Sequence, residues 1–252
     1  IEIGSNDGTL LKFFKDLGMR ILGIDPAKEI ARRATSNGIE TLPEFFTSRL
    51  AQEINNNYGS AKVVTANNVF AHADDLTDIV NGCKILLEPS GIFIFEVQYL
   101  SDLYCNQFFD MIYHEHLSYH SVGPLKTFLE RNQMELLDVS RVPTHGGSIR
   151  CFVQIENGNR SVQPSVDRFI KEEESLGLYQ VENFFRFEKR IQLLKRELKT
   201  LLYKIKEQGK SLGGFGAPAK TTTLMFHFDI DHRMLNFIVD DNPLKQGLFS
   251  PG

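Results

Sequence analysis

The densest group of potentially catalytic side chains lies in the segment MIYHEHLSYH, residues 111–120. It holds three of the chain's seven histidines, beside a glutamate and two tyrosines. A zincin helix needs two histidines four residues apart, with a glutamate directly after the first. His116 and His120 have this spacing, but Leu117 takes the place of the glutamate. The pattern therefore argues against zinc and leaves an acid/base site or a polar loop as the alternatives.

A glycine turn follows the first predicted strand, in the opening stretch IEIGSNDGTLL. Gly4 and Gly8 would let backbone N–H groups of the turn lie very close to a ligand. Glu2 lies just before the turn, where a carboxylate would repel a pyrophosphate and attract a cation. Asp25 ends the next predicted strand, at the position where an acidic side chain binds the hydroxyls of a ribose.

This turn lacks the dinucleotide spacing G-x-G-x-x-G. Together with its acidic neighbours it favours S-adenosylmethionine, which carries a sulfonium, an ammonium and a ribose but no phosphate. The alternative is that G-x-x-x-G forms only a tight strand-to-helix turn. The predicted cofactor-binding residues lie at the ends of predicted strands: Glu2, Gly4, Ser5, Asn6, Gly8, Asp25, Pro26, Asn67 and Asn68.

A second glycine loop, residues 214–219, fits G-x-G-x-x-A, and Asp240 or Asp241 ends the strand that follows. Taken alone, this motif suggests NAD. Pro218 and Lys220 near the start of the helix favour instead a surface for a phosphate-bearing substrate. A glycine turn kept only for packing is the remaining alternative.

The elements that must position these residues alternate between short apolar runs and amphipathic segments as far as about residue 156. This alternation predicts an α/β fold with a doubly wound parallel sheet. The final two strands are separated only by PTHGGS and are expected to form an antiparallel hairpin at the sheet edge. The predicted strands are 1–3, 20–24, 62–66, 91–97, 135–139 and 148–154. The predicted helices are 10–17, 27–36, 46–56 and 76–86.

Farther along the chain, the spacing of apolar residues predicts one long helix over about 184–205, with a stop at Gly209. Its apolar stripe indicates packing on the same protein or on a second copy. A strand, a glycine loop, a helix and another strand then follow. The stripe consists of Phe184, Phe187, Ile191, Leu194, Leu198, Leu201 and Ile205.

The composition is that of a globular protein of about two domains, with 252 residues, 42% of them hydrophobic and 24% charged. A net charge of -4 gives no general attraction for nucleic acid, and no apolar run approaches the ~20 residues of a membrane span. Cys83, Cys105 and Cys151 are far apart and odd in number, which indicates core or strand residues in a reducing cytoplasm. Because Ile1 opens directly on a strand and the tail GLFSPG ends in a turn, we expect a piece of a longer protein.

Several stretches, in this order, resemble the C-methyltransferases that act on nucleotide-linked 4-keto deoxysugars: IEIGSNDG, NNVFAH, FEVQY, YHEHLSYHS, GGSIR, GFGAPAK and VDDNPLKQG. The resemblance implies a class I methyltransferase domain over 1–157 and a helical connector over 158–210. It also implies an incomplete, Rossmann-like C-terminal domain over 211–252. Zinc would belong only to a separate N-terminal domain of the family. One departure is Thr221-Thr222, where the family often has Gly-Asn.

Methyl transfer to carbon needs a carbanion equivalent, which a carbon beside a ketone provides when a base removes its proton. By resemblance His116 is this base, Glu115 is its polar neighbour and Tyr113 lies over the sugar. His72 follows a predicted strand and faces the same edge of the sheet. The residues predicted to contact the nucleotide-linked sugar are Tyr119, Ser148 and Lys220.

Plainer interpretations of these residues remain open. His114 is compatible with a structural role, and Tyr119 and His120 with simple packing under the loop. The protein as a whole could be a nucleotide-sugar-binding protein without turnover, an NAD-dependent oxidoreductase, or a methyltransferase acting on oxygen or nitrogen. The last class would need no base beside a ketone.

Overall fold

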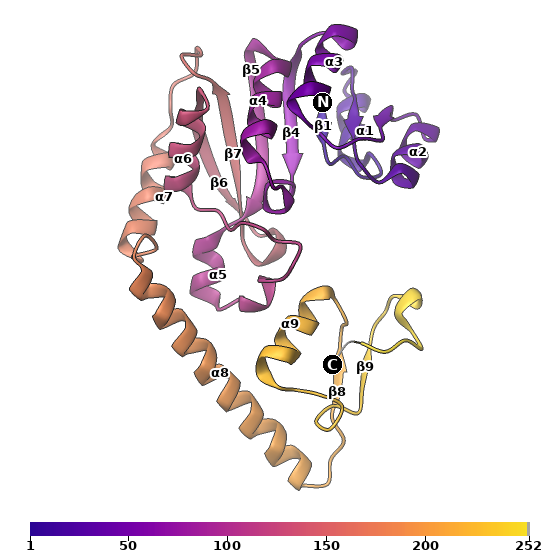
Figure 1. Cartoon of the computed structure of the whole chain (residues 1–252), viewed down its shortest axis with the longest axis vertical. Helices are drawn as coiled ribbons and strands as arrows, with labels where there is room; N and C mark the ends of the chain where they lie inside the picture. The colour runs from indigo at the N-terminus through magenta and orange to yellow at the C-terminus, as the bar shows by residue number, and fades with distance from the viewer. Residues whose placement is uncertain (251–252) are drawn as a thin grey trace. The chain divides into compact units, whose positions relative to one another are not determined.

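The computed structural model describes residues 1–250; the last two residues of the predicted tail lie outside this range (Figure 1). The chain forms two compact units. The first contains residues 1–100 and 117–176, and the second contains residues 101–116 and the chain from Gly177 on. The boundaries of these units differ from those of the three predicted segments 1–157, 158–210 and 211–252. Residues 101–116, which lie within the first predicted segment, belong to the second unit.

The first unit is built on a seven-stranded sheet in the order β3-β2-β1-β4-β5-β7-β6. The first five strands are parallel, whereas β7 runs antiparallel to both β5 and β6. The predicted α/β fold and the antiparallel edge hairpin are therefore confirmed. The strands are β1 Glu2–Ile3, β2 Gly23–Ile24, β3 Thr41–Leu42, β4 Ala61–Asn67, β5 Leu87–Gln98, β6 Met134–Val142 and β7 Ser148–Ile155.

Two helices of this unit begin at side-chain caps. Thr47 caps α3 by accepting the N–H of Leu50 at 3.1 Å, and Asp75 caps α4 by accepting the N–H of Asp78 at 2.9 Å. The helices are α1 Thr9–Asp16, α2 Lys28–Ser36, α3 Ser48–Tyr58, α4 Leu76–Leu86, α6 Val122–Arg131 and α7 Pro164–Ser175. The sequence analysis missed β3, α6 and α7, and its prediction for 20–24 was too long.

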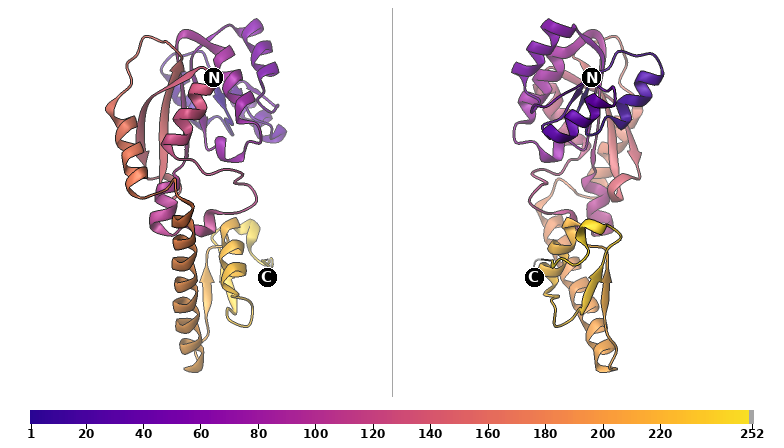
Figure 2. Two further views of the ribbon diagram at one scale, coloured as in Figure 1. Left: turned by 60° about the vertical axis from the view of Figure 1, so that its left-hand side comes forward. Right: turned by 90° about the vertical axis from the view of Figure 1, so that its right-hand side faces the viewer.

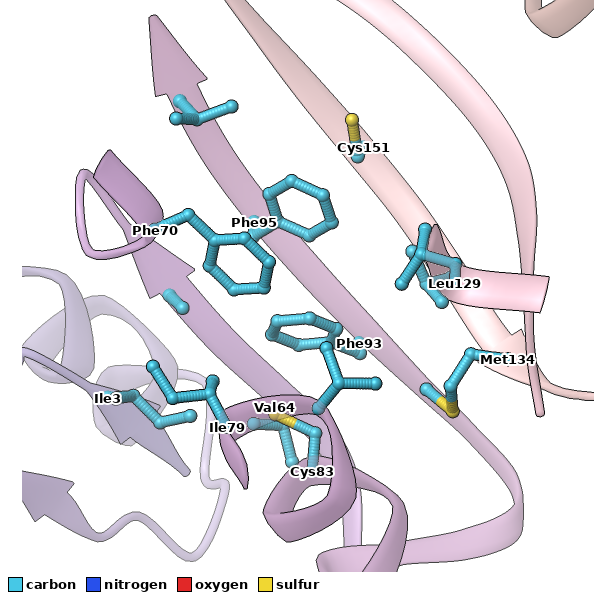
Figure 3. Packing of buried hydrophobic residues seen from close by; sticks show 14 of the residues in the cluster. Ile3, Val64, Phe70, Ile79, Cys83, Phe93, Phe95, Leu129, Met134 and Cys151 are labelled. Atoms are coloured by element: carbon cyan, nitrogen blue, oxygen red, sulfur yellow. The ribbon is translucent and has the colours of Figure 1, made fainter. Parts of the chain in front are cut away.

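The main core lies on one face of the sheet, where α3, α4, α6 and α7 cover it. Phe93 and Phe95 alternate along β5 and point to this face. Phe70 comes from the turn after β4 and stacks on Phe95, with ring centroids 4.4 Å apart and planes 4° apart (Figure 3). The predicted core position of the cysteines holds for Cys83 and Cys151 but is wrong for Cys105, which is exposed. The turn after β4 is therefore anchored directly in the core.

A buried carboxylate joins two of these helices. Glu173 on α7 is completely buried, and its oxygens accept the N–H groups of Val122 and Gly123 at 2.6 and 3.0 Å. These groups belong to the first turn of α6, where Ser121 makes no side-chain cap. Glu173 therefore caps α6 from a distant part of the sequence.

Replacing Glu173 with alanine is expected to lower the free energy of unfolding by about 2–4 kcal/mol, because the buried N–H of Val122 and the partly buried N–H of Gly123 both lose their acceptor. The measurement is denaturant unfolding of the variant and the parent. Glu174→Ala, which changes the exposed neighbour, is the matched control and should stay within about 0.5 kcal/mol of the parent. Equal losses in both variants would contradict this role of Glu173.

The second unit contains α8 Val181–Glu207, α9 Ala219–Phe228, and two parallel strands, β8 Gly213–Phe215 and β9 Phe237–Val239. Figure 2 shows α8 as one uninterrupted helix, as the apolar stripe predicts. Its core also receives Phe109 from η2 Phe109–Met111, just after α5 Leu100–Asn106. This core consists of Phe109, Ile191, Met225, Phe228, Ile230 and Met234. No helix between residues 1 and 250 is both long and apolar enough to cross a membrane.

Candidate active site

The turn after β1 has the conformation that its glycines predict. Gly4 and Gly8 adopt φ angles of +69° and +79°, which side chains other than glycine rarely tolerate. The N–H groups of Gly4 and Ser5 both donate to the carbonyl of Ile24, at 2.8 and 3.1 Å. The turn is therefore fixed against the end of β2. Thus the loop ahead of α1 lies at the carboxyl end of the parallel strands, where such sheets bind ligands.

Asp25 follows β2 and holds this turn together. Its Oδ2 accepts the N–H of Asn6 and its Oδ1 accepts the N–H of Ala27, both at 2.9 Å. A carboxylate has about four lone-pair positions, so two remain for other donors such as ribose hydroxyls. The ribose-binding role of Asp25 stays a prediction, whereas its contacts with the loops at Asn6 and Ala27 were not predicted from the sequence.

Glu2 is the buried carboxylate beneath the turn, with 4% of its surface exposed. Its Oε2 has no hydrogen-bond partner among the described residues. Burial raises the pKa of Glu2 from 4.5 to about 7, while a hydrogen bond from Asn67 opposes this shift. A cationic ligand bound beside such an acid would be held by ionic attraction and by a hydrogen bond to the unpaired oxygen.

The other predicted cofactor residues lie near this edge of the sheet. Asn67 ends β4, and Asn68 follows it with a left-handed φ of 56° while its N–H donates to the carbonyl of Glu96 at 2.8 Å. Asn6 is exposed within the glycine turn, and Pro26 is exposed just after Asp25. All nine predicted cofactor residues belong to the first unit.

The catalytic candidate His116 lies in a turn, not in an extended segment. Its N–H donates to the carbonyl of Tyr113 at 3.0 Å. Its Nδ1 lies 2.8 Å from the carbonyl of Met111. Because a carbonyl only accepts, Nδ1 carries a proton, and Nε2 is the only ring nitrogen that can act as a base. The side chain is 9% exposed, so this nitrogen is held in a fixed direction.

Tyr113 accompanies His116, with ring centroids 4.3 Å apart. Burial, and after it the charge of Glu115, raises the pKa of the Tyr113 hydroxyl above 10.0. The hydroxyl therefore stays protonated near neutral pH and can donate a hydrogen bond. The pair supplies a basic nitrogen and a hydroxyl donor within one turn.

One expectation for the neighbouring residues needs correction. His114 lies beside Glu115, with 3.9 Å between its Nε2 and a carboxylate oxygen of Glu115. The side chain of His114 is 84% exposed, so it does not pack as a structural residue would. In an extended segment His114 and His116 would lie on the same side, with Glu115 on the other. Because residues 114–115 form a turn, this alternation does not apply here.

Ser148 was predicted to contact the substrate, but this expectation is wrong for the structure described. Ser148 is completely buried at the start of β7, and its hydroxyl donates to the carbonyl of Thr144 at 3.1 Å. It closes the turn between β6 and β7. Thr144 in turn donates to Glu96, which also pairs with Arg150 at 2.8 Å.

The second glycine loop has the predicted strand, loop, helix and strand. Asp240 after β9 accepts the N–H of Ala217 at 2.8 Å and lies 3.3 Å from Lys245. Its carboxylate is therefore committed to the loop itself. Lys220 lies in the first turn of α9, with its ammonium 3.9 Å from Asp110 and about half of its side chain exposed.

The structure thus places His72 and Tyr119 in the unit with the glycine turn, and Tyr113, Glu115, His116 and Lys220 in the other unit. His72 is exposed in η1 Phe70–His72, directly after β4. Sequence reasoning missed Glu96, a buried acid at the carboxyl end of β5, although an acid within an otherwise apolar strand is a visible signal. No group of three or more His, Cys, Asp or Glu side chains in residues 1–250 could hold a metal ion.

Comparisons with known proteins agree with this architecture. Residues 1–139 match a family model described as a methyltransferase domain, and residues 143–252 match one described as a C-methyltransferase C-terminal domain. The C-methyltransferase NovU of Streptomyces niveus is 36% identical over 252 residues, which are 100% of this chain and 60% of that protein. A ubiquinone biosynthesis O-methyltransferase of Colwellia psychrerythraea is 27% identical over 97 residues, 38% of this chain and 39% of that protein. Protein PH0226 of Pyrococcus horikoshii shares the fold, with a TM-score of 0.50, 13% identity, and coverage of 62% and 80% of the two chains.

The sheet order and the glycine turn define a class I methyltransferase domain. The chain belongs to the methyltransferase family, and its later residues match the C-terminal domain of C-methyltransferases. Its cofactor is S-adenosylmethionine. The orphaned Oε2 of Glu2 and the free lone pairs of Asp25 fit the cationic and ribose groups of this cofactor.

Cofactor affinity is expected to rise with pH through about pH 7, because only ionised Glu2 attracts a cation. Glu2→Gln should bind roughly 10-fold more weakly at pH 8, since it lacks a charge-assisted bond, and should lose this pH dependence. Calorimetry with S-adenosylmethionine from pH 6 to 8 measures both effects. Parallel affinity profiles for the variant and the parent would contradict the assignment.

Glu2 also affects the stability of the protein in the absence of cofactor. Its pKa is higher in the folded protein than in the unfolded chain, so its contribution to stability is fully present below about pH 4.5 and is lost as the pH rises through about 7. Glu2→Gln is neutral throughout. The variant should therefore be more stable than the parent at pH 8 in thermal unfolding.

Proposed function

We propose that the protein is a C-methyltransferase that methylates the carbon beside the ketone of a nucleotide-linked 4-keto deoxysugar. The observation that carries this proposal is the tautomer of His116. Its Nδ1 proton is donated to the carbonyl of Met111, so Nε2 is the ring nitrogen that can take up a further proton. A transfer to carbon needs such a base, whereas many transfers to oxygen or nitrogen do not.

In this proposal S-adenosylmethionine binds at the turn after β1 and supplies an electrophilic methyl group. Glu2 attracts its positive charge, Asp25 accepts from its ribose, and the N–H groups of the turn approach it closely. Asn67 and Asn68 complete the edge of this site at the end of β4. The support is the orphaned Oε2 of Glu2 and the positive φ angles that keep the turn open.

On the substrate side, His116 takes the proton from the carbon beside the ketone. Tyr113 donates its hydroxyl proton in a hydrogen bond to the oxygen on which negative charge grows. His72 and Tyr119 are proposed to line the sugar from the first unit. Lys220 is proposed to meet a phosphate, and it would then exchange its contact with Asp110 for one with the substrate.

The proposal is tested by incubating the protein with ¹³C-methyl-labelled S-adenosylmethionine and a panel of nucleotide-linked 4-keto deoxysugars. NMR of the product distinguishes a methyl group on carbon from one on oxygen or nitrogen. A carbon-bound methyl group supports the proposal. A methyl group on oxygen or nitrogen contradicts it, and so does tight binding of the sugar nucleotide without any transfer.

A further inference from the structure

One hydrogen bond joins the peptide groups beside two histidines of the proposed site. The N–H of Leu117 donates to the carbonyl of Ala71 at 2.7 Å. This N–H belongs to the peptide group that links His116 to Leu117, and the carbonyl belongs to the group that links Ala71 to His72. The start of the segment 117–120 is therefore tied to the η1 turn within the first unit.

The side chains of Ser118 and His120 make further contacts between segment 117–120 and the η1 turn. Ser118 donates its hydroxyl to the carbonyl of Phe70 at 3.4 Å, and Nε2 of His120 lies 3.0 Å from the same hydroxyl oxygen. The ring of His120 also meets the ring of Phe70 edge-on, with centroids 6.2 Å apart.

The η1 turn, which receives these hydrogen bonds, is anchored in the core through Phe70. Phe70 is completely buried and stacks on Phe95 in the centre of the core (Figure 3). His120 is 7% exposed, and its own carbonyl accepts the N–H of Leu100 at 2.9 Å. Burial lowers the pKa of His120 to about 4, against a hydrogen bond to Phe70 that raises it, so the ring stays neutral when His116 changes charge.

We propose that His120 and Ser118 are positioning residues, which lock the segment directly after His116 onto the η1 turn and thereby fix the backbone on the C-terminal side of His116. This inference rests on the proposed function, because it assigns His116 the role of base. A buried histidine that only filled space could be replaced by an apolar side chain at little cost. A positioning residue cannot, because displacing a base by about 1 Å slows proton transfer by roughly 100-fold.

Three variants of the full protein test the proposal: His120→Leu, His120→Gln and Ser118→Ala. The readouts are kcat and KM for methyl transfer, cofactor affinity by calorimetry, and exchange of the hydrogen beside the ketone in heavy water without methyl donor. His120→Leu should slow kcat and exchange together by roughly 10–100-fold, with cofactor affinity unchanged. His120→Gln should recover most of the loss, because its side-chain amide, which can both donate and accept, replaces the ring nitrogen as the hydrogen-bond partner of Ser118.

Two results would overturn the positioning role: a folded His120→Leu that exchanges hydrogen as fast as the parent, or a His120→Gln as slow as His120→Leu. If His120→Leu does not fold, Ser118→Ala decides, since it removes one hydroxyl from a partly exposed position. Ser118→Ala should slow exchange by roughly 3–10-fold, and an unchanged rate would refute the inference. A parent protein that never exchanges this hydrogen refutes the proposed function itself, which separates the two failures.

Discussion

His116→Asn is expected to keep the fold and both ligands while slowing turnover by about 10²–10⁴-fold, the usual contribution of a positioned acid/base group. The structure explains why asparagine is the informative replacement. Its amide nitrogen takes the place of Nδ1 and can still donate to the carbonyl of Met111, whereas nothing replaces the lone pair of Nε2. The measurement is kcat for methyl transfer, with the folded state checked by circular dichroism.

The matched control for this variant is His114→Ala, which changes the exposed histidine two residues earlier. It should leave kcat within a few-fold of the parent, because His114 holds no buried contact in the turn. Comparable losses in the two variants would show that the turn at 113–116 tolerates no substitution. The loss in His116→Asn would then say nothing in favour of a base.

Asp25→Ala should weaken the binding of S-adenosylmethionine by about 1.5–3 kcal/mol, roughly 10–150-fold, because a charge-assisted bond to the ribose is lost. The structure adds a second consequence. The N–H groups of Asn6 and Ala27 lose their acceptor, so the variant should also be less stable. Calorimetry on the folded fraction gives the affinity, and thermal unfolding gives the stability.

Asp7→Ala is the control for the loss of a carboxylate from the same turn. Asp7 is exposed, and its carboxylate accepts from the N–H and the hydroxyl of Thr9, at 3.1 and 2.7 Å. Its removal changes the net charge equally but should leave cofactor affinity within about threefold of the parent. If Asp25→Ala lowers stability but leaves affinity unchanged, Asp25 is only a link between two loops.

Much of the fold could be predicted because strong apolar runs specify the buried strands. The runs at β4 and β5 and the glycine turn after β1 are local patterns. The missed elements depend on distant contacts. Strand β3 has only two residues, and α6 contains Gly123 and Pro124, a pair typical of turns. This helix gains its cap from Glu173, about 50 residues away, which no local pattern reveals.

The positions of Glu2 and Asp25 near the ends of β1 and β2 could be predicted from the sequence pattern, while their binding roles stay predictions. The hydrogen-bond partners of individual side chains could not be predicted, because they depend on the geometry of neighbouring turns. Ser148 could face a ligand by strand alternation, yet its hydroxyl is used to close a turn. The tautomer of His116 likewise depends on the carbonyl of Met111, which only the turn geometry brings within reach.

The central claim is that His116 removes a proton from the carbon beside a ketone. The most direct test is to incubate the protein with S-adenosylhomocysteine and a nucleotide-linked 4-keto deoxysugar in heavy water, and to follow the hydrogen beside the ketone by NMR. Exchange needs only proton removal and no methyl donor, so the parent should exchange this hydrogen and His116→Asn should not. If methyl transfer survives in His116→Asn while the parent never exchanges the hydrogen, His116 is not the base and the proposed mechanism is wrong.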